Sequence, residues 1–99
     1  MSEVQVVFWR DIPAQVKARQ GGERSARALT ARFQEAIDAA AMRAGLTETD
    51  DYLGEWRSSP WLEHAGLPDE AAQRRAAEIE AEYSDERLRQ LAENGGRTT

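Results

Sequence analysis

The chain has 99 residues and no cysteine, and its formal net charge is −5 at neutral pH. This length suits one domain with a thin core, and the lack of cysteine excludes disulfides, zinc–thiolate sites and iron–sulfur ligation by this chain. An acidic chain repels a phosphate backbone, so the composition argues against non-specific binding of nucleic acid.

Residues 4–9 predict the first strand, because nearly all of them are β-branched or aromatic. Simple alternation puts Val7 and Trp9 on one face and Val4 and Val6 on the other. Apolar side chains on both faces indicate a strand that is covered on both sides or that meets a partner.

Residues 14–29 predict a β-hairpin. Apolar or small residues alternate with polar ones from 14 to 19, and Gly21 and Gly22 form a turn signal. Residues 25–29 then supply the return strand, although their alanine and arginine content suits a helix as well.

The rest of the chain predicts helices. Residues 31–44 carry apolar side chains at helical spacing, and Gly45 stands where a helix usually ends. We expect a short helix over about residues 48–57, a connector over 61–66, and a longer helix that begins at Pro68 and restarts near Ser84.

This order predicts an α+β fold. A small antiparallel sheet of about three N-terminal strands precedes three helices that pack on one of its faces. We expect a single domain over residues 1–93 and a disordered tail over 94–99, because glycines and polar residues close the chain. The first residues lack the basic n-region of a signal peptide, and no apolar run reaches the length of a membrane span, so we expect a cytoplasmic protein.

A series of motifs lies within roughly residues 3 to 60. Its members are Phe8–Val16, which reads FWRDIPAQV, then Arg32–Asp38 followed by Ala41–Leu46, and finally Asp51–Arg57. In this order the motifs resemble the small bacterial "virulence factor" domain family. The resemblance implies no agreed catalytic residues. It implies instead a short accessory protein, of the kind that accompanies enzymes handling methyl groups on tetrahydrofolate or corrinoids.

The turn after the first strand is the first candidate site. A strand end followed by a fixed turn presents its side chains rigidly, and Trp and Arg are enriched at binding hot spots. The predicted partner-binding residues are Trp9, Arg10, Asp11, Ile12, Pro13 and Gln15. The same residues could instead form a purely structural turn, in which Arg10 and Asp11 pair with each other or with nearby backbone groups. A buried Trp9 with an internally paired Arg10 would favour that second interpretation.

The hairpin is the second candidate site, since the first thirty residues hold five basic and three acidic side chains. A phosphate, a cofactor tail or an acidic partner could bind here. The predicted anion-binding residues are Lys17, Arg19, Arg24 and Arg27, with Arg10 nearby. Such charges also protect a sheet edge from aggregation, and an exposed edge could instead form a homodimer by strand pairing.

Other residues give weaker signals. Trp56 and Trp61 could form a docking patch, but a thin core favours burial of both. His64 is the only histidine, and it predicts a surface or packing role. We expect no metal and no cofactor. The sequence therefore predicts a protein-interaction domain that serves a larger enzyme and has no catalytic activity of its own. The alternative is a small anion- or ligand-binding module on the hairpin, and catalysis is conceivable only in a site shared with another chain.

Overall fold

The computed structural model describes residues 1–46 and 48–98. Its elements, in chain order, are β1 (Ser2–Trp9), β2 (Ile12–Gln20), β3 (Glu23–Ala28), α1 (Ala31–Arg43), α2 (Thr49–Leu53), β4 (Trp56–Ser58), β5 (Leu62–His64), α3 (Pro68–Glu82) and α4 (Asp85–Glu93). The α+β class predicted from the sequence is confirmed. These described residues form two more strands and one more helix than we expected.

The strands form one antiparallel sheet in the order β3-β2-β1-β4, and β5 also pairs with β1. β4 lies beside residues 7–9 of β1, and β5 lies beside residues 2–4. The long β1–β2–β3 meander is the predicted hairpin region with its preceding strand. Gly21 has a φ of 58° in the turn between β2 and β3, which explains why glycine is needed there.

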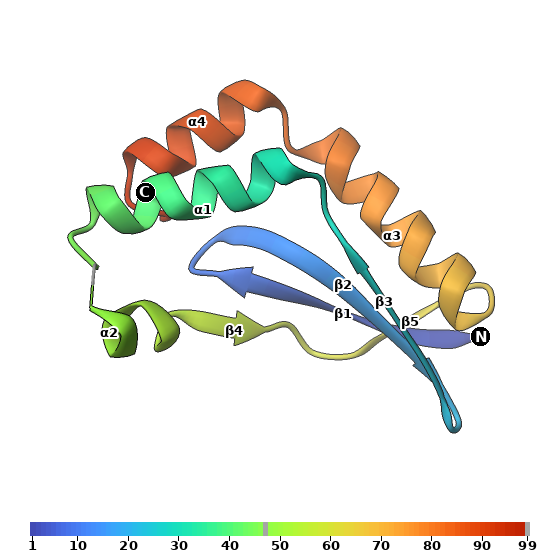
Figure 1. The fold of residues 1–99 in the computed structure, drawn as a ribbon. Coiled ribbons are helices and arrows are strands. Elements are labelled where there is room, and N and C mark those ends of the chain that lie inside the picture. Colours follow the sequence, from blue (N-terminus) through green and yellow to red (C-terminus); the bar gives the residue numbers. More distant parts are fainter. Residues whose placement is uncertain (47, 99) are drawn as a thin grey trace.

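Helices cover one face of the sheet. Figure 1 shows α1 and α3 above the strands, with α4 lying along α1. Val4, Val6 and Val16 are buried in the same hydrophobic core as Phe33 and Ile37 of α1 and Ile79 of α3. We call the opposite face of the sheet the open face. Within the described part of the chain, no helix is long and apolar enough to cross a membrane.

The register of the sheet changes near Trp9. Val7 pairs with Gln15 but Phe8 pairs with Pro13, so Ala14 is left as an extra residue in β2. Such a bulge bends the strand and increases its twist. Trp9 is fully buried whereas Val7 is half-buried, although simple alternation puts these two side chains on one face of β1.

The expected helix over 48–57 is much shorter. α2 ends before Gly54, and Trp56–Ser58 pairs with β1 as β4. The connector over 61–66 likewise contains β5. Both short strands form because the edge of β1 offers unpaired backbone groups, which a local sequence pattern does not reveal.

The C-terminal helices follow the expected break. Tyr83 adopts an extended conformation, and the Ser84 hydroxyl then accepts a hydrogen bond from the Arg87 amide at 3.1 Å, which caps α4. Residues 94–98 differ from the disordered tail that we expected. Gly95 and Gly96 are buried, and the Gly96 carbonyl accepts a hydrogen bond from the Asp11 amide at 2.8 Å. Thr99, the end of that predicted tail, lies outside the described residues.

Candidate functional site

The turn between β1 and β2 is anchored by Trp9. Its side chain is fully buried, and its indole N–H donates to the Tyr52 carbonyl at 2.9 Å. The Trp9 and Tyr52 rings stack with their centroids 5.6 Å apart. Trp9 therefore joins β1 to α2 and is not available to a partner.

Arg10 is held by internal partners. Its guanidinium forms an ion pair with Glu55 at 3.1 Å and donates to the Gly95 carbonyl at 2.9 Å. Its backbone has a φ of 52°, the left-handed region that few residues other than glycine adopt. The Arg10 amide donates to the Glu55 carbonyl at 3.1 Å, which helps to hold this conformation.

Asp11 completes the same corner. It accepts a hydrogen bond from the Thr98 amide at 2.8 Å and forms an ion pair with Arg57 at 3.3 Å. Burial alone would raise the pKa of the Asp11 carboxyl, but the Thr98 hydrogen bonds and the Arg57 charge lower this pKa below its ordinary value. The carboxylate thus fastens the end of the chain to the turn.

The corner residues therefore favour the structural interpretation over partner binding. Ile12 and Pro13 are buried, like Trp9, and Arg10 and Asp11 are paired internally. Gln15 is the one predicted partner-binding residue that lies away from the corner. It is half-buried and pairs with Val7 and Ala28.

Basic side chains gather on the open face of the sheet. Arg19 and Arg24 are direct partners across β2 and β3, and Lys17 lies two residues from Arg19 on the same face. The Arg19 guanidinium carbon lies 3.9 Å from the centroid of the Trp61 ring. We call Lys17, Arg19, Arg24 and Trp61 the basic–aromatic patch.

The charge of this patch is only partly compensated. Arg19 forms an ion pair with Glu3 at 3.0 Å. Among the residues that the structure describes, neither Lys17 nor Arg24 forms an ion pair. The patch therefore carries an excess of positive charge in a chain whose net charge is negative.

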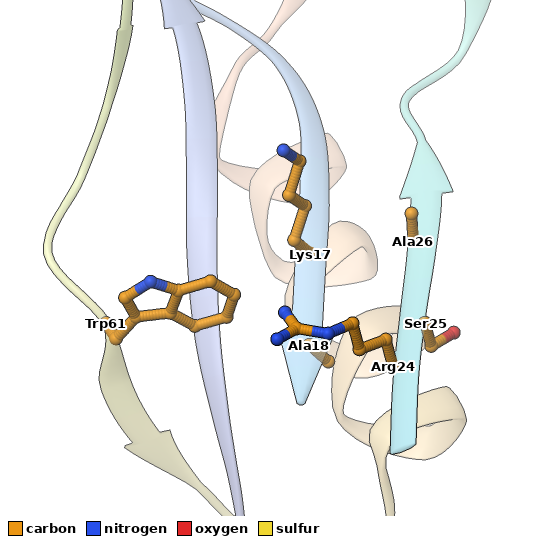
Figure 2. A pocket seen from close by; sticks show the side chains of 6 residues that line it. All are labelled: Lys17, Ala18, Arg24, Ser25, Ala26 and Trp61. Atoms are coloured by element: carbon orange, nitrogen blue, oxygen red, sulfur yellow. The ribbon is translucent and has the colours of Figure 1, made fainter. Parts of the chain in front are cut away.

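The patch borders a shallow hollow of about 420 Å³. Figure 2 shows the Trp61 ring on one side of it and Arg24 and Ala26 of β3 on the other, with Lys17 on β2 in between. Ala26 is exposed, and its small side chain leaves room above β3. An aromatic wall beside two cations can hold an anionic or a planar group.

Two sequence predictions about this region need revision. Arg27 pairs with the buried Val16, so strand alternation places it on the opposite face from the patch. Three of the four predicted anion-binding residues thus come together, and Arg27 does not join them. The expected burial of both tryptophans holds only in part, because Trp56 and Trp61 are each partly buried, and Trp56 packs against the core whereas Trp61 lies on the open face beside Arg19.

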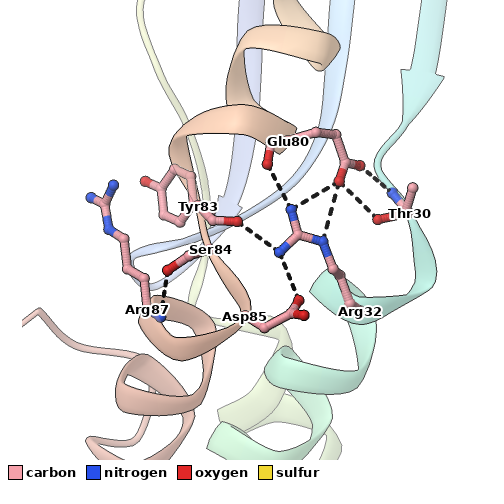
Figure 3. Close-up of polar contacts among 7 residues, drawn as sticks. All are labelled: Thr30, Arg32, Glu80, Tyr83, Ser84, Asp85 and Arg87. Atoms are coloured by element: carbon pink, nitrogen blue, oxygen red, sulfur yellow. Dashed lines mark hydrogen bonds and ion pairs between the residues drawn. The ribbon is translucent and has the colours of Figure 1, made fainter.

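Figure 3 shows a second polar network, where α1 begins beside the junction of α3 and α4. The Arg32 guanidinium donates to the Tyr83 carbonyl at 2.6 Å and to the Glu80 carbonyl at 2.8 Å. It also forms ion pairs with the Glu80 and Asp85 carboxylates, each at 3.1 Å. This network, which sequence reasoning missed, joins three helices.

Glu80 receives further hydrogen bonds from Thr30. The Thr30 amide donates at 2.7 Å and its hydroxyl at 2.9 Å. Burial alone would raise the pKa of the Glu80 carboxyl, but the Thr30 and Arg32 hydrogen bonds lower this pKa below its ordinary value. The internal partners of Arg32 and Glu80 give the network a structural role.

A family model described as virulence factor matches residues 7–92. The chain belongs to the virulence factor family. Comparison with curated proteins and with solved structures gives no match. The virulence factor match spans both the buried corner and the basic–aromatic patch. Among residues 1–46 and 48–98, no group of three or more His, Asp or Glu side chains could hold a metal ion.

Proposed function

We propose that this domain is a cytoplasmic protein-interaction module without catalytic activity of its own, and that its open face binds a subunit of a larger enzyme. The observation that carries this proposal is the basic–aromatic patch. Lys17 and Arg24 lie beside the half-exposed Trp61 on a sheet face that α1 and α3 leave uncovered. Tryptophan and arginine are the side chains that contribute most often to binding hot spots.

The charge of the patch indicates the surface that it would select. Positive charge concentrated on one face attracts an acidic surface and repels a basic one. The family resemblance directs the first search toward enzymes that transfer methyl groups on tetrahydrofolate or corrinoids. An acidic surface on such a subunit would complement the patch.

Co-purification with matched charge variants tests this proposal. A tagged chain would be recovered from its native cells, and the proteins recovered with it would be quantified by mass spectrometry. The test variant is Lys17→Glu with Arg24→Glu. The control is Arg43→Glu with Arg74→Glu, which makes the same change in net charge at exposed positions on α1 and α3.

We expect the unmodified chain and the control variant to recover a partner in stoichiometric amount. The amount of partner recovered with the test variant should fall at least about tenfold, since charge pairs at interfaces contribute over 1 kcal/mol. Equal recovery of the partner with both variants would show that the partner binds elsewhere on the chain and would contradict the proposal.

A ligand-binding module is the second candidate, because the hollow beside Trp61 is bounded by two cations. Pyrophosphate is a suitable probe, and tryptophan fluorescence is a suitable signal since Trp61 is half-exposed. Saturable quenching that disappears in Trp61→Phe and in Arg24→Gln would support a small anionic ligand. Unchanged fluorescence at millimolar pyrophosphate would reject it.

A further inference from the structure

β3 is the outer strand of the sheet, and its outer edge is unpaired within the described part of the chain. The Leu29 amide donates to the Ala14 carbonyl of β2 at 3.1 Å. Backbone groups alternate in direction along an antiparallel ladder. The N–H and C=O groups of Ser25 and Arg27 therefore face β2, and those of Arg24, Ala26 and Ala28 face outward.

The side chains along this edge are exposed, and their positive charges complement those of an acidic strand. Arg24, Ala26, Arg27 and Ala28 are all exposed. Arg24 and Ala26 lie on the open face beside the hollow, whereas Arg27 lies on the other face. An added strand would meet one arginine on each of its faces, together with a small alanine that leaves room for a larger side chain.

We propose that β3 accepts an extended, acidic segment of the partner protein as an additional antiparallel strand. Three outward residues allow up to about six backbone hydrogen bonds, and alternate side chains of the segment supply selectivity. One acidic side chain pairs with Arg24 and a second pairs with Arg27. An apolar side chain opposite Ala26 enters the hollow beside Trp61. This inference rests on the proposed function, because it specifies how the open face and its edge hold that partner.

A second copy of the chain fits this edge less well. Antiparallel self-pairing of β3 centred on Ala26 would place Arg24 opposite Ala28 and Arg27 opposite Ser25, so neither arginine would face an acidic side chain. The paired strands would together carry four arginines and only two glutamates. An acidic strand makes ion pairs with these arginines instead.

A labelled peptide provides a direct probe. The sequence Val-Glu-Phe-Thr-Glu-Lys, capped at both ends and labelled with fluorescein, places its residues opposite Ala28 through Glu23 in antiparallel order. Its two glutamates then lie opposite Arg27 and Arg24, and its phenylalanine opposite Ala26. Fluorescence anisotropy would measure binding, and size-exclusion chromatography with light scattering would measure self-association.

Ala26→Pro tests the backbone contact. Proline removes the outward N–H of residue 26, which β2 does not use, and proline is tolerated on an edge strand in this orientation. We expect peptide affinity to fall at least tenfold. The control Ala26→Ser keeps the N–H and should bind within about twofold of the unmodified chain, because the change adds only one hydroxyl group.

A charge exchange tests the register of the side chains and does not depend on how proline affects the strand. The variant Arg24→Glu with Arg27→Glu should lose the acidic peptide and gain the peptide Val-Lys-Phe-Thr-Lys-Lys, whose last lysine still lies opposite Glu23. Binding of neither peptide by any form of the chain would overturn the inference. So would a dimer of the unmodified chain that Ala26→Pro dissociates, since the strand would then be added by a second copy.

The two proposals fail separately. If the native partner is lost with Lys17→Glu and Arg24→Glu but is retained at full level with Ala26→Pro, the open face binds the partner and strand addition is wrong. If the partner is retained with both variants, the proposed function is wrong as well.

Discussion

Gly96 lies directly against the indole ring of Trp9. A Cβ atom at Gly96 would come within 2.9 Å of the ring atom Cζ3, closer than real side chains approach. Gly96 also has a φ of 90°. The end of the chain therefore closes the buried corner, and glycine is needed there both for its conformation and for its lack of a side chain.

Gly96→Ala should destabilise the fold by about 2 to 4 kcal/mol, because it combines a strained backbone with overpacking against Trp9. The midpoint of urea unfolding, followed by circular dichroism, measures this change. Gly22→Ala is the control, since nothing lies within 4 Å of a Cβ there and its φ is not in the left-handed region. We expect the control to change stability by less than about 1 kcal/mol. Equal stability of the two variants would contradict the close packing at Trp9.

Two variants of Arg10 separate the contributions that its side chain and its backbone conformation make to the stability of the fold. Arg10→Ala and Arg10→Gly both remove the contacts with Glu55 and Gly95, but only glycine adopts a φ of 52° without strain. Arg10→Gly should therefore be more stable than Arg10→Ala by about 1 kcal/mol. Thermal unfolding of both variants at one pH gives this difference, and the reverse order would show that the backbone at residue 10 is not strained.

Much of the architecture is predictable from local patterns. β1 and β2 contain β-branched or alternating residues, and α1 has clear helical periodicity, so the local sequence predicts each of these elements. β4 and β5 have three residues each and form only because the edge of β1 lies beside them. No window of sequence around Trp56 or Leu62 contains that information.

The candidate site was harder to predict for the same reason. The burial of Trp9 depends on Tyr52 and Gly96, which are distant in sequence. Composition indicated a basic hairpin, but strand alternation separates Arg24 from Arg27, and only the pairing of β3 with β2 shows which of the two lies on the open face. The contact of Trp61 with Arg19 likewise depends on the path of the chain from β4 to β5.

The stability of the fold should fall in acid, partly through Glu80. Its pKa is lowered in the folded state, so the carboxylate stabilises the fold above its unfolded-state pKa, and this contribution is lost as the pH falls through the folded-state pKa. Glu80→Gln should cost about 1 to 2 kcal/mol near neutral pH, allowing for partial exposure, and less below about pH 4.

Urea unfolding at pH 7 and near pH 3.5 tests this expectation. Glu82→Gln is the control, because it makes the same chemical change at an exposed position of α3. We expect the difference between the unmodified chain and Glu80→Gln to shrink at the lower pH, and the control to show little difference at either. A difference that grows in acid would mean that Glu80 is bound more tightly as the neutral acid.

Trp61→Ala should separate binding from stability. Trp61 is half-exposed, and its contact with Arg19 at the surface contributes about 0.5 to 1 kcal/mol. The variant should therefore unfold near the temperature of the unmodified chain but recover much less partner in co-purification. A large fall in the unfolding temperature would assign Trp61 a structural role instead.

The most direct measurement is nuclear magnetic resonance of the ¹⁵N-labelled chain as the co-purified partner is added. We expect the amide signals of residues 15–19 and 24–28 and the indole signal of Trp61 to change most, because these groups surround the basic–aromatic patch. The amides of the buried corner at Trp9 and of the exposed side of α3 should change least. Changes centred on the helices, with the signals of β2 and β3 unmoved, would contradict binding through the open face.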